Sequence, residues 1–342
     1  MEGPTLNLWM VIGFLIAAYA VVANDSLQTL GTYITSNHGT TPQWIQMAFI
    51  SAITTAVLLV GWLAHAGDPS WGRLELFPMP DPFTWVYVIP PIVVLALTAW
   101  GAPVSTSFLV LSSFVPSQST RLIQSSLGGY GLAFVIALAS WGLGLWVLER
   151  WVVHSNRQGA AITPIWTGLQ WGSTGFLWSL WLVQDLANIF IYLPRTLNGM
   201  AIASATLILC LGLCSLIALG GGPIQTVLRS KTNTTDLRSA TVIDCLFGLC
   251  LLAQACLSRF PLSTTWVFLG LLAGREFALL SRQQEWGEEH NARGADVVLH
   301  SVGSDLGKAT VALVVSLALA LVLQPLMTWT ANGLPSNGST IS

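Results

Sequence analysis

Residues 103–107 read Pro-Val-Ser-Thr-Ser, and residues 261–265 read Pro-Leu-Ser-Thr-Thr. A second pair of words has nearly the same spacing: residues 24–28 read Asn-Asp-Ser-Leu-Gln, and residues 184–188 read Gln-Asp-Leu-Ala-Asn. The chain therefore carries one polar pattern twice, in the same order, and each copy interrupts apolar sequence. Such paired interruptions predict a repeated fold with a binding site where the two copies meet.

The composition predicts a membrane protein. The chain has 342 residues, of which 53% are hydrophobic and only 8% charged, and its mean hydropathy is +0.67, whereas a soluble domain carries about 25% charged residues. A Trp-rich stretch, 164–183, adds to a set of apolar stretches that approach the roughly 20 residues needed to cross a bilayer. The set is 8–23, 45–66, 85–100, 131–153, 198–220, 240–257, 264–281 and 309–329. We expect roughly 9 to 12 helical membrane elements, some of them broken.

Several function classes are disfavoured. The net charge is −2, so no basic face suggests nucleic acid, and no Walker motif indicates ATP hydrolysis. The start lacks a basic n-region and is read as a first membrane helix rather than a removed signal peptide. Cys210 and Cys214 have the spacing of a metal clip, but no His lies nearby, so we interpret them as packing residues and expect no cofactor.

The order of segments predicts two transmembrane repeats, 1–158 and 159–342. Each begins with a helix that leads into its acidic word, and each contains a re-entrant hairpin, opened by Gly101-Ala102-Pro103 in the first half and by Pro261 in the second. We expect a polar linker at 154–163 and a solvated, hydrophilic loop at 282–308, with or without a short amphipathic helix.

Asp25 and Asp185 are the candidate cation ligands. A carboxylate at membrane depth costs several kcal/mol unless it meets a cation, a proton or a water-filled cavity. The alternative is a structural acid that caps the following half-helix, since Asp is favoured at helix N-caps, and one residue can serve both roles. The second acid at the equivalent place favours the functional interpretation.

The two Pro-x-Ser-Thr words are candidate anion sites. Pro103 and Pro261 suit the first position of a helix, where no N–H is needed. The residues that follow then offer free backbone N–H groups and hydroxyls, which bind an anion without a basic side chain. The alternative is that these hydroxyls only bond to the preceding turn or to a neighbouring helix. The hydroxyls belong to Ser105, Thr106, Ser107, Ser263, Thr264 and Thr265.

These words resemble those of the inorganic phosphate transporter (PiT) family. Its duplicated signature, Gly-x-Asn-Asp-x-x-Asn-x-x-Gly-Thr, is similar to residues 24–32 and 184–191, and its Pro-Val-Ser-Thr-Thr-His word is similar to the hydroxyl words. The resemblance implies an all-α polytopic fold of two inverted repeats. It also implies symport of a small inorganic oxyanion, phosphate first, with Na⁺ or H⁺ as the coupling ion. Asp25 and Asp185 would bind sodium, and the hydroxyl words would line the substrate site together with Asn24, Gln28, Gln184 and Asn188.

The chain also departs from the family pattern. Val22 and Leu182 replace the signature glycines, and Phe108 and Trp266 replace the His of the second word. The amide of Gln28 stands where the family has Asn, and so does that of Gln184. Longer amides and aromatic side chains change the shape of the cavity, so sulfate and bicarbonate are the nearest competitors of phosphate.

Other polar residues carry weaker signals. Arg275 and Glu276 suggest either a local ion pair or a gate, and we favour the ion pair. Arg121 occupies the corresponding place after the first hairpin, and Asp244 is interpreted as an acid that suits the helix dipole near the start of 240–257.

The sequence leaves other function classes open: an ion channel, or an intramembrane enzyme with Asp25 and Asp185 as a paired acid. We expect a transporter rather than an enzyme, because the hydroxyl words have no role in aspartyl chemistry. The expected location is a bacterial inner membrane or a plasma membrane. The expected partners are the anion and the lipid bilayer, and a homodimer is an open possibility.

Overall fold

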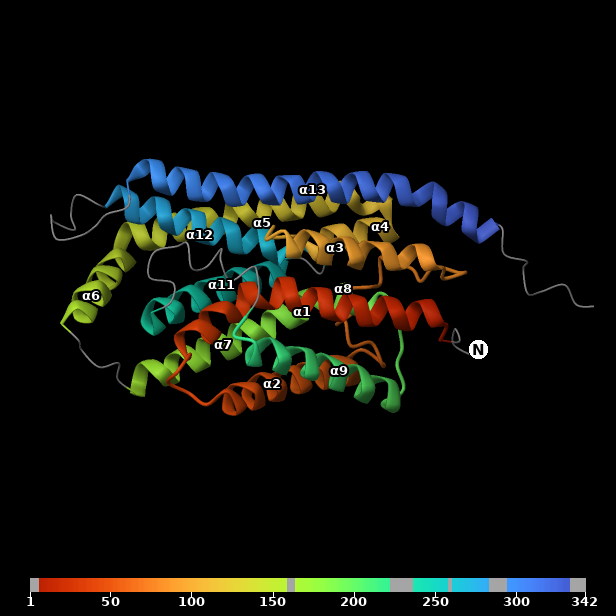
Figure 1. Ribbon diagram of the computed structural model, residues 1–342, viewed down its shortest axis with the longest axis horizontal. Helices are drawn as coiled ribbons and strands as arrows, with labels where there is room; N and C mark the ends of the chain where they lie inside the picture. The colour runs from red at the N-terminus through yellow and green to blue at the C-terminus, as the bar shows by residue number, and fades with distance from the viewer. Residues whose placement is uncertain (1–5, 159–163, 222–235, 258–259, 283–293, 333–342) are drawn as a thin grey trace, which may run out of the picture.

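The computed structural model describes residues 6–158, 164–221, 236–257, 260–282 and 294–332, and every regular element within them is helical. The first half contains α1 (Leu8–Ser36), α2 (Gln43–Ala64), η1 (Trp85–Val88), α3 (Ile89–Ala99), η2 (Ser107–Leu111), α4 (Ser112–Phe114), η3 (Pro116–Gln118), α5 (Ser119–Ser140), η4 (Trp141–Leu145) and α6 (Trp146–Arg157). The second half contains α7 (Pro164–Asp185), α8 (Ala187–Phe190), α9 (Gly199–Ala218), α11 (Leu237–Leu257), α12 (Thr264–Ser281) and α13 (Ala295–Asn332). Most of the long helices run along the long axis of the molecule (Figure 1).

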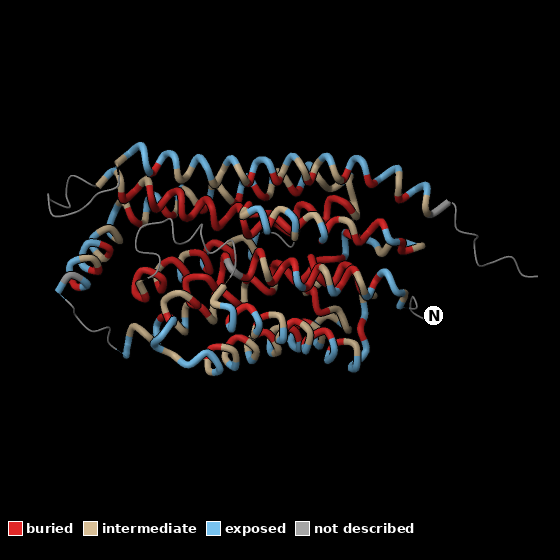
Figure 2. Tube along the Cα trace, viewed as in Figure 1, coloured by how far each residue is buried: buried red, intermediate tan, exposed pale blue. Residues whose placement is uncertain are grey.

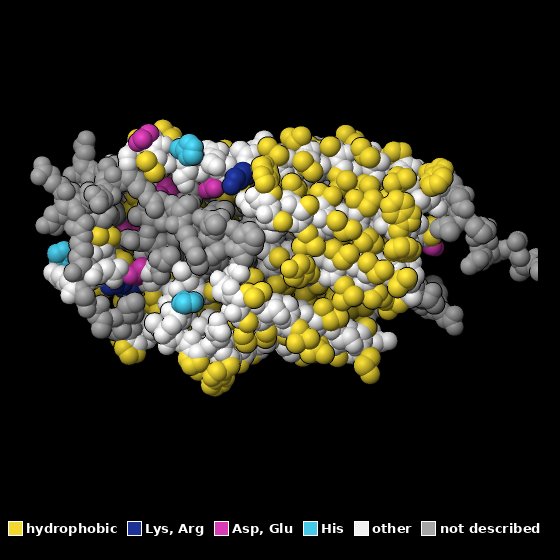
Figure 3. All heavy atoms as spheres, in the orientation of Figure 1, with side chains coloured by type: hydrophobic (Ala, Val, Ile, Leu, Met, Phe, Trp, Pro, Cys, Tyr) yellow, Lys and Arg dark blue, Asp and Glu magenta, His cyan; other side chains and the backbone are white. Residues whose placement is uncertain are grey.

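The protein is an all-α integral membrane protein, as the composition predicts. Six of the described helical segments are long and apolar enough to cross a bilayer: Leu8–Ser26, Gln43–Ala64, Pro116–Asn156, Gly199–Ala218, Leu237–Leu257 and Ala295–Thr330. Apolar side chains cover a broad band of the face in Figure 3, and most of the charged side chains visible there lie toward the α6 end. The stretch predicted at 264–281 is α12, which is buried inside the bundle rather than exposed to lipid (Figure 2).

The interruption predicted after each first helix occurs in the second half alone. α1 continues without a break from Leu8 to Ser36, so Asp25 lies inside a helix and does not cap a following one. α7 does end at Asp185, and the four-residue α8 follows it. The similar polar sequences predicted a break in both helices. In the first half, α1 packs against α3, α7 and α9 and remains unbroken.

Other boundaries also differ from those predicted. α5, η4 and α6 form one helical run from Ser119 to Arg157, so the start of the expected 154–163 linker is helical, and its residues 159–163 lie outside the described part. Within the expected loop 282–308, residues 295–308 form the first turns of α13, whereas residues 283–293 lie outside the described part. Polarity alone does not end a helix that has a neighbour to pack on.

Two glycines let α12 pack closely on α5 in the second hairpin. α12 packs along α5, and a Cβ atom added to Gly270 or Gly274 would lie 2.3 Å from the carbonyl oxygens of Tyr130 and Phe134, respectively. Only glycine permits this distance, in a small-xxx-small pattern that membrane helices use for tight packing. α12 carries Thr264 and Thr265 at its start, so the contact places both hydroxyls at depth in the bundle.

Helix contacts in the two halves correspond. α5 packs on α12, and α13 packs on η2 and α4; α1 contacts α9, and α7 contacts α2. By order along the chain, α5 corresponds to α13, and η2 with α4 corresponds to α12, so the first two contacts are equivalent. In the same way α1 corresponds to α7 and α2 to α9, so the last two contacts are equivalent. This correspondence is expected of two repeats related by a two-fold axis.

Candidate functional site

The two hydroxyl words begin the buried helices of the hairpins, but not in the way that the prolines suggest. Pro103 and Pro261 lie before the helices rather than at their first positions, so that prediction is wrong. Ser263 is the N-cap of α12, and its hydroxyl accepts the Trp266 N–H at 3.3 Å. Ser105 accepts the Phe108 N–H at 3.1 Å in the first half. These two serines therefore close the helix starts and leave the following hydroxyls to face the core.

Asp25 is bound by hydroxyls from both hairpins. The Thr106 hydroxyl donates to Oδ2, and the Thr265 hydroxyl reaches Oδ1 at 3.4 Å. The neighbouring amide of Asn24 donates to Oδ1 at 2.6 Å. Asp25 is 1% exposed, so its carboxylate is solvated by protein donors instead of water.

Asp185 is bound in the same way. The Thr264 hydroxyl donates to Oδ2 at 2.6 Å, and the Ser107 hydroxyl donates to Oδ1 at 3.0 Å. The Asn188 amide, one turn further along, donates to Oδ1 at 2.8 Å and also reaches the hydroxyls of Thr106 and Ser107. Asn188 therefore ties the second acidic word to the first hairpin.

The hydrogen bonds from hydroxyls to Asp25 are equivalent to those to Asp185. Each acid takes one bond from the threonine in its own half, Thr106 or Thr264, and one from the last residue of the hydroxyl word in the other half. The single proton of the Thr265 hydroxyl is shared between Asp25 and the Val104 carbonyl, which lies nearer at 2.9 Å, so the two hairpins touch directly. Neither half alone could build either set of donors.

The charge balance at the centre is negative. Among the described residues, neither Asp25 nor Asp185 forms an ion pair with a basic side chain. The two carboxylates are close enough for their charges to repel each other. The guanidinium of Arg73, 5% exposed in the segment between α2 and α3, acts electrostatically on Asp185. Two buried carboxylates stabilised by neutral hydroxyls suit a bound cation.

The amides divide into those that are bonded and those that keep unpartnered atoms. The side chain of Asn24 makes two hydrogen bonds with the backbone of Val104: its nitrogen donates to the carbonyl, and its oxygen accepts from the N–H. Gln28 is 2% exposed, yet neither its side-chain nitrogen nor its oxygen has a partner. Gln184 donates to the Leu251 carbonyl at 3.4 Å but leaves its own oxygen unpartnered, as does Asn188. Buried polar atoms without partners are costly and point to a ligand or to water at these positions.

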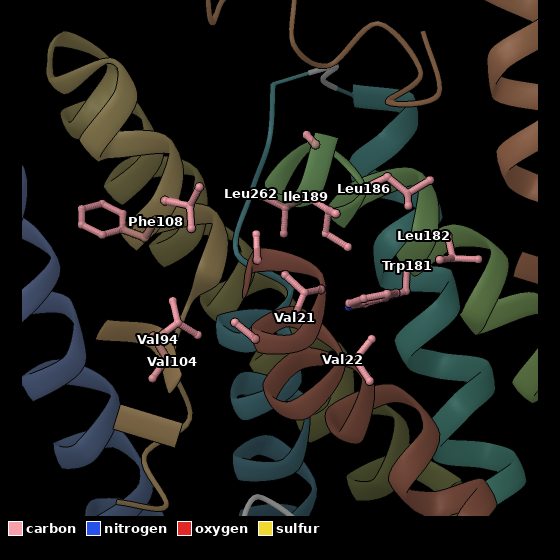
Figure 4. Close-up of a cluster of buried hydrophobic side chains, with 14 of the residues drawn as sticks. Val21, Val22, Val94, Val104, Phe108, Trp181, Leu182, Leu186, Ile189 and Leu262 are labelled. Atoms are coloured by element: carbon pink, nitrogen blue, oxygen red, sulfur yellow. The ribbon is translucent and has the colours of Figure 1, made fainter. Parts of the chain in front are cut away.

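The surroundings of the site are apolar (Figure 4). Val104 and Leu262 precede the two hydroxyl words, and Val21 of α1 and Ile189 of α8 lie near them, each at most 2% exposed. Phe108, in place of the family His, is also buried, so this position supplies no polar group. The polar groups therefore lie among buried apolar side chains, where their electrostatic interactions are strong.

A buried ionic network lies toward the α6 end, apart from the acids. Arg275 forms ion pairs with Glu149 at 2.6 Å and with Glu276 at 3.0 Å, so Arg275 and Glu276 form the predicted ion pair and Glu149 extends it. At the start of α11, burial alone would raise the pKa of Asp236, but hydrogen bonds from Arg238 and Asn156 hold it below its usual value. The guanidinium carbon of Arg121 lies over the Phe260 ring, 4.3 Å from the ring centroid.

Sequence reasoning missed two contributors. The first is Glu149, because an acid that pairs with a basic residue 126 positions away leaves no local signal in the sequence. Asp244 lies in the second turn of α11 and bonds to Thr32 and Thr174, so the dipole interpretation is incomplete. A signal for this was present in the sequence. Three polar residues of α1 share one helical face, namely Asp25, Gln28 and Thr32.

No family profile matches the sequence, and no curated protein matches it by sequence. One solved structure, described as "The sodium-dependent phosphate transporter", does match in fold. It superposes with a TM-score of 0.62 over 95% of this chain and 98% of its own, at 14% sequence identity. At this identity the likeness shows a shared fold, and it extends over nearly the whole of both chains.

Proposed function

We propose that the protein is a secondary transporter that couples the movement of inorganic phosphate to sodium, as a divergent member of the PiT family built from two inverted repeats. The observation that carries this proposal is the central pair of carboxylates, each bound by hydroxyls from both halves. The fold shared with a sodium-dependent phosphate transporter supports it.

The carboxylates suit a cation better than a shared proton. An aspartyl enzyme holds two carboxyl groups against each other with one proton between them. Here all four oxygens of Asp25 and Asp185 accept bonds from hydroxyls or amides. Donors of this kind stabilise the ionised form, and an ionised pair in a buried site attracts a cation from outside the chain.

The anion would then bind beside the cations. Within the repeated words, Gln28 has an unpartnered N–H₂ group, which can donate to an oxyanion. Bound sodium would supply the positive field that the words lack. The remaining substrate residues of this proposal are Asn24, Ser105, Thr106, Ser107, Gln184, Asn188, Ser263, Thr264 and Thr265, of which Ser105 and Ser263 act through the helix starts that they cap.

A panel of labelled anions tests the proposal. Purified protein in proteoliposomes is given phosphate, sulfate or bicarbonate, with sodium or with choline outside. We expect phosphate uptake that requires sodium, and exchange of labelled for unlabelled phosphate in counterflow. Sodium-dependent uptake of sulfate or bicarbonate alone would replace phosphate as the substrate, and an ohmic current without counterflow would overturn the carrier mechanism.

A further inference from the structure

Another buried carboxylate, Asp244, lies outside both the central site and the Arg275 network. Asp244 of α11 is 1% exposed and lies between α1 and α7. Its Oδ1 accepts the Thr32 hydroxyl at 2.7 Å, and its Oδ2 accepts the Thr174 hydroxyl at 2.6 Å. Within the described residues it has no basic partner.

A tryptophan fixes the orientation of the two amides that lead to Asp244. The Trp171 indole N–H can only donate, and it reaches Asn37 Oδ1 at 3.1 Å. The Asn37 amide must therefore donate to Gln170 Oε1, at 2.9 Å, which turns the Gln170 amide toward the Thr174 oxygen, at 3.2 Å. Thr174 is left to donate its proton to Asp244. Each donor in this series of hydrogen bonds thus points toward the carboxylate, which supports the ionised form of Asp244.

An ionised carboxylate buried in this way needs a compensating charge. Neutral hydroxyls offset only part of the cost of removing the charge from water, which is several kcal/mol in a protein interior. The available ligand atoms are carboxylate and hydroxyl oxygens, which hard cations prefer. One carboxylate balances one positive charge, so the site suits a monovalent cation rather than a divalent one.

The hydrogen-bonded chain also leads to an opening. The Thr41 hydroxyl donates to Asn37 Oδ1 at 3.2 Å. Thr41 and its neighbour Pro42 line a pocket of about 490 Å³ with His38 and Gln46. In the other direction, Gln28 lies one turn of α1 from Thr32 and one turn from Asp25, with both amide atoms unpartnered. Polar groups therefore extend from the pocket past Asp244 to the central site.

We propose that Asp244, Thr32 and Thr174 form a separate sodium site, which exchanges its ion with solvent through the pocket at Thr41. The role of this ion in transport rests on the proposed function, but its binding does not. The Asp244 site would hold sodium whether or not phosphate is the substrate.

Equilibrium binding of ²²Na⁺ to purified protein in detergent tests the site without any anion. In the double variant Asp25→Asn/Asp185→Asn, we expect saturable sodium binding to remain and to be lost when Asp244→Asn is added. In the wild-type background, Asp244→Asn lowers the number of ions bound per protein by one. Thr174→Val keeps the side-chain volume and is expected to weaken this binding at least tenfold.

The matched control is Thr206→Val, which removes a buried hydroxyl of α9 that bonds only to its own helix at Ile202. We expect it to bind sodium as the parent does. Sodium binding that Asp244→Asn and Thr174→Val both leave unchanged would overturn the inference, even if phosphate uptake depends on sodium. Conversely, sodium binding lost on these substitutions in a protein that carries no phosphate would overturn the proposed function and leave this site standing.

Discussion

Replacing Asp185 with Asn removes one charge from the centre of the protein while keeping the shape of the side chain. The size of the effect depends on the burial of the site. A cation about 4 Å from a carboxylate gains about 4 kcal/mol at an effective dielectric constant of about 20, but only about 1 kcal/mol in water. Asp185 is 1% exposed, so the larger value applies. Since about 1.4 kcal/mol is tenfold in affinity, we expect sodium affinity to fall roughly a thousandfold.

The assay is the sodium concentration that gives half-maximal phosphate uptake in proteoliposomes. The matched control is Asp296→Asn, which removes an exposed acid from the first turn of α13 and is expected to change this concentration by less than twofold. A change of about fivefold or less for Asp185→Asn would refute the reasoning, because it is the change expected of a solvated acid. Circular dichroism and gel filtration establish that the variant is folded.

The remaining predictions concern the hydroxyls, the close helix contact and the ionic network. Thr264→Val removes a charge-assisted hydrogen bond of about 1.5 kcal/mol and is expected to weaken phosphate affinity roughly tenfold in uptake assays, whereas Arg121→Ala changes it less; the opposite order would place the anion elsewhere. Gly270→Ala forces α12 away from α5 and is expected to cost about 1–3 kcal/mol in thermal unfolding, with Gly131→Ala, whose Cβ meets no atom within 4 Å, as its control. Glu149→Gln removes one of the two carboxylates that pair with Arg275 and leaves the pair with Glu276, so it is expected to destabilise the protein by about 1.5–3 kcal/mol; unfolding at the wild-type temperature would show that the Glu149 pair is not needed.

Local patterns predicted most of the helices and selected polar residues that the structure places together. Hydropathy predicted the apolar helices, because crossing a bilayer sets both their length and their composition. The pairing of Asp25 with Asp185, and of Thr106 with Thr264, was visible because a repeated polar word in apolar sequence has no role in ordinary helix packing.

Continuity of helices could not be predicted from the words. Asn24-Asp25 and Gln184-Asp185 are similar in sequence, yet α1 is unbroken and α7 ends. Both aspartates lie inside the bundle. Whether the backbone beside each of them remains helical depends on which neighbouring groups bond to the backbone carbonyls and amides. That information lies in packing rather than in propensity.

The sequence by itself determined that this chain is a helical membrane protein with two acids and two hydroxyl words placed equivalently in its halves. Only the tertiary structure decided that each acid is bound by the hydroxyl word of the other half as well as its own, through Thr265 for Asp25 and Ser107 for Asp185. It also decided that Asp244 meets Thr32, 212 positions away. Hydrogen bonds between such distant residues leave no periodic signal, because the fold rather than the local spacing brings their atoms within reach.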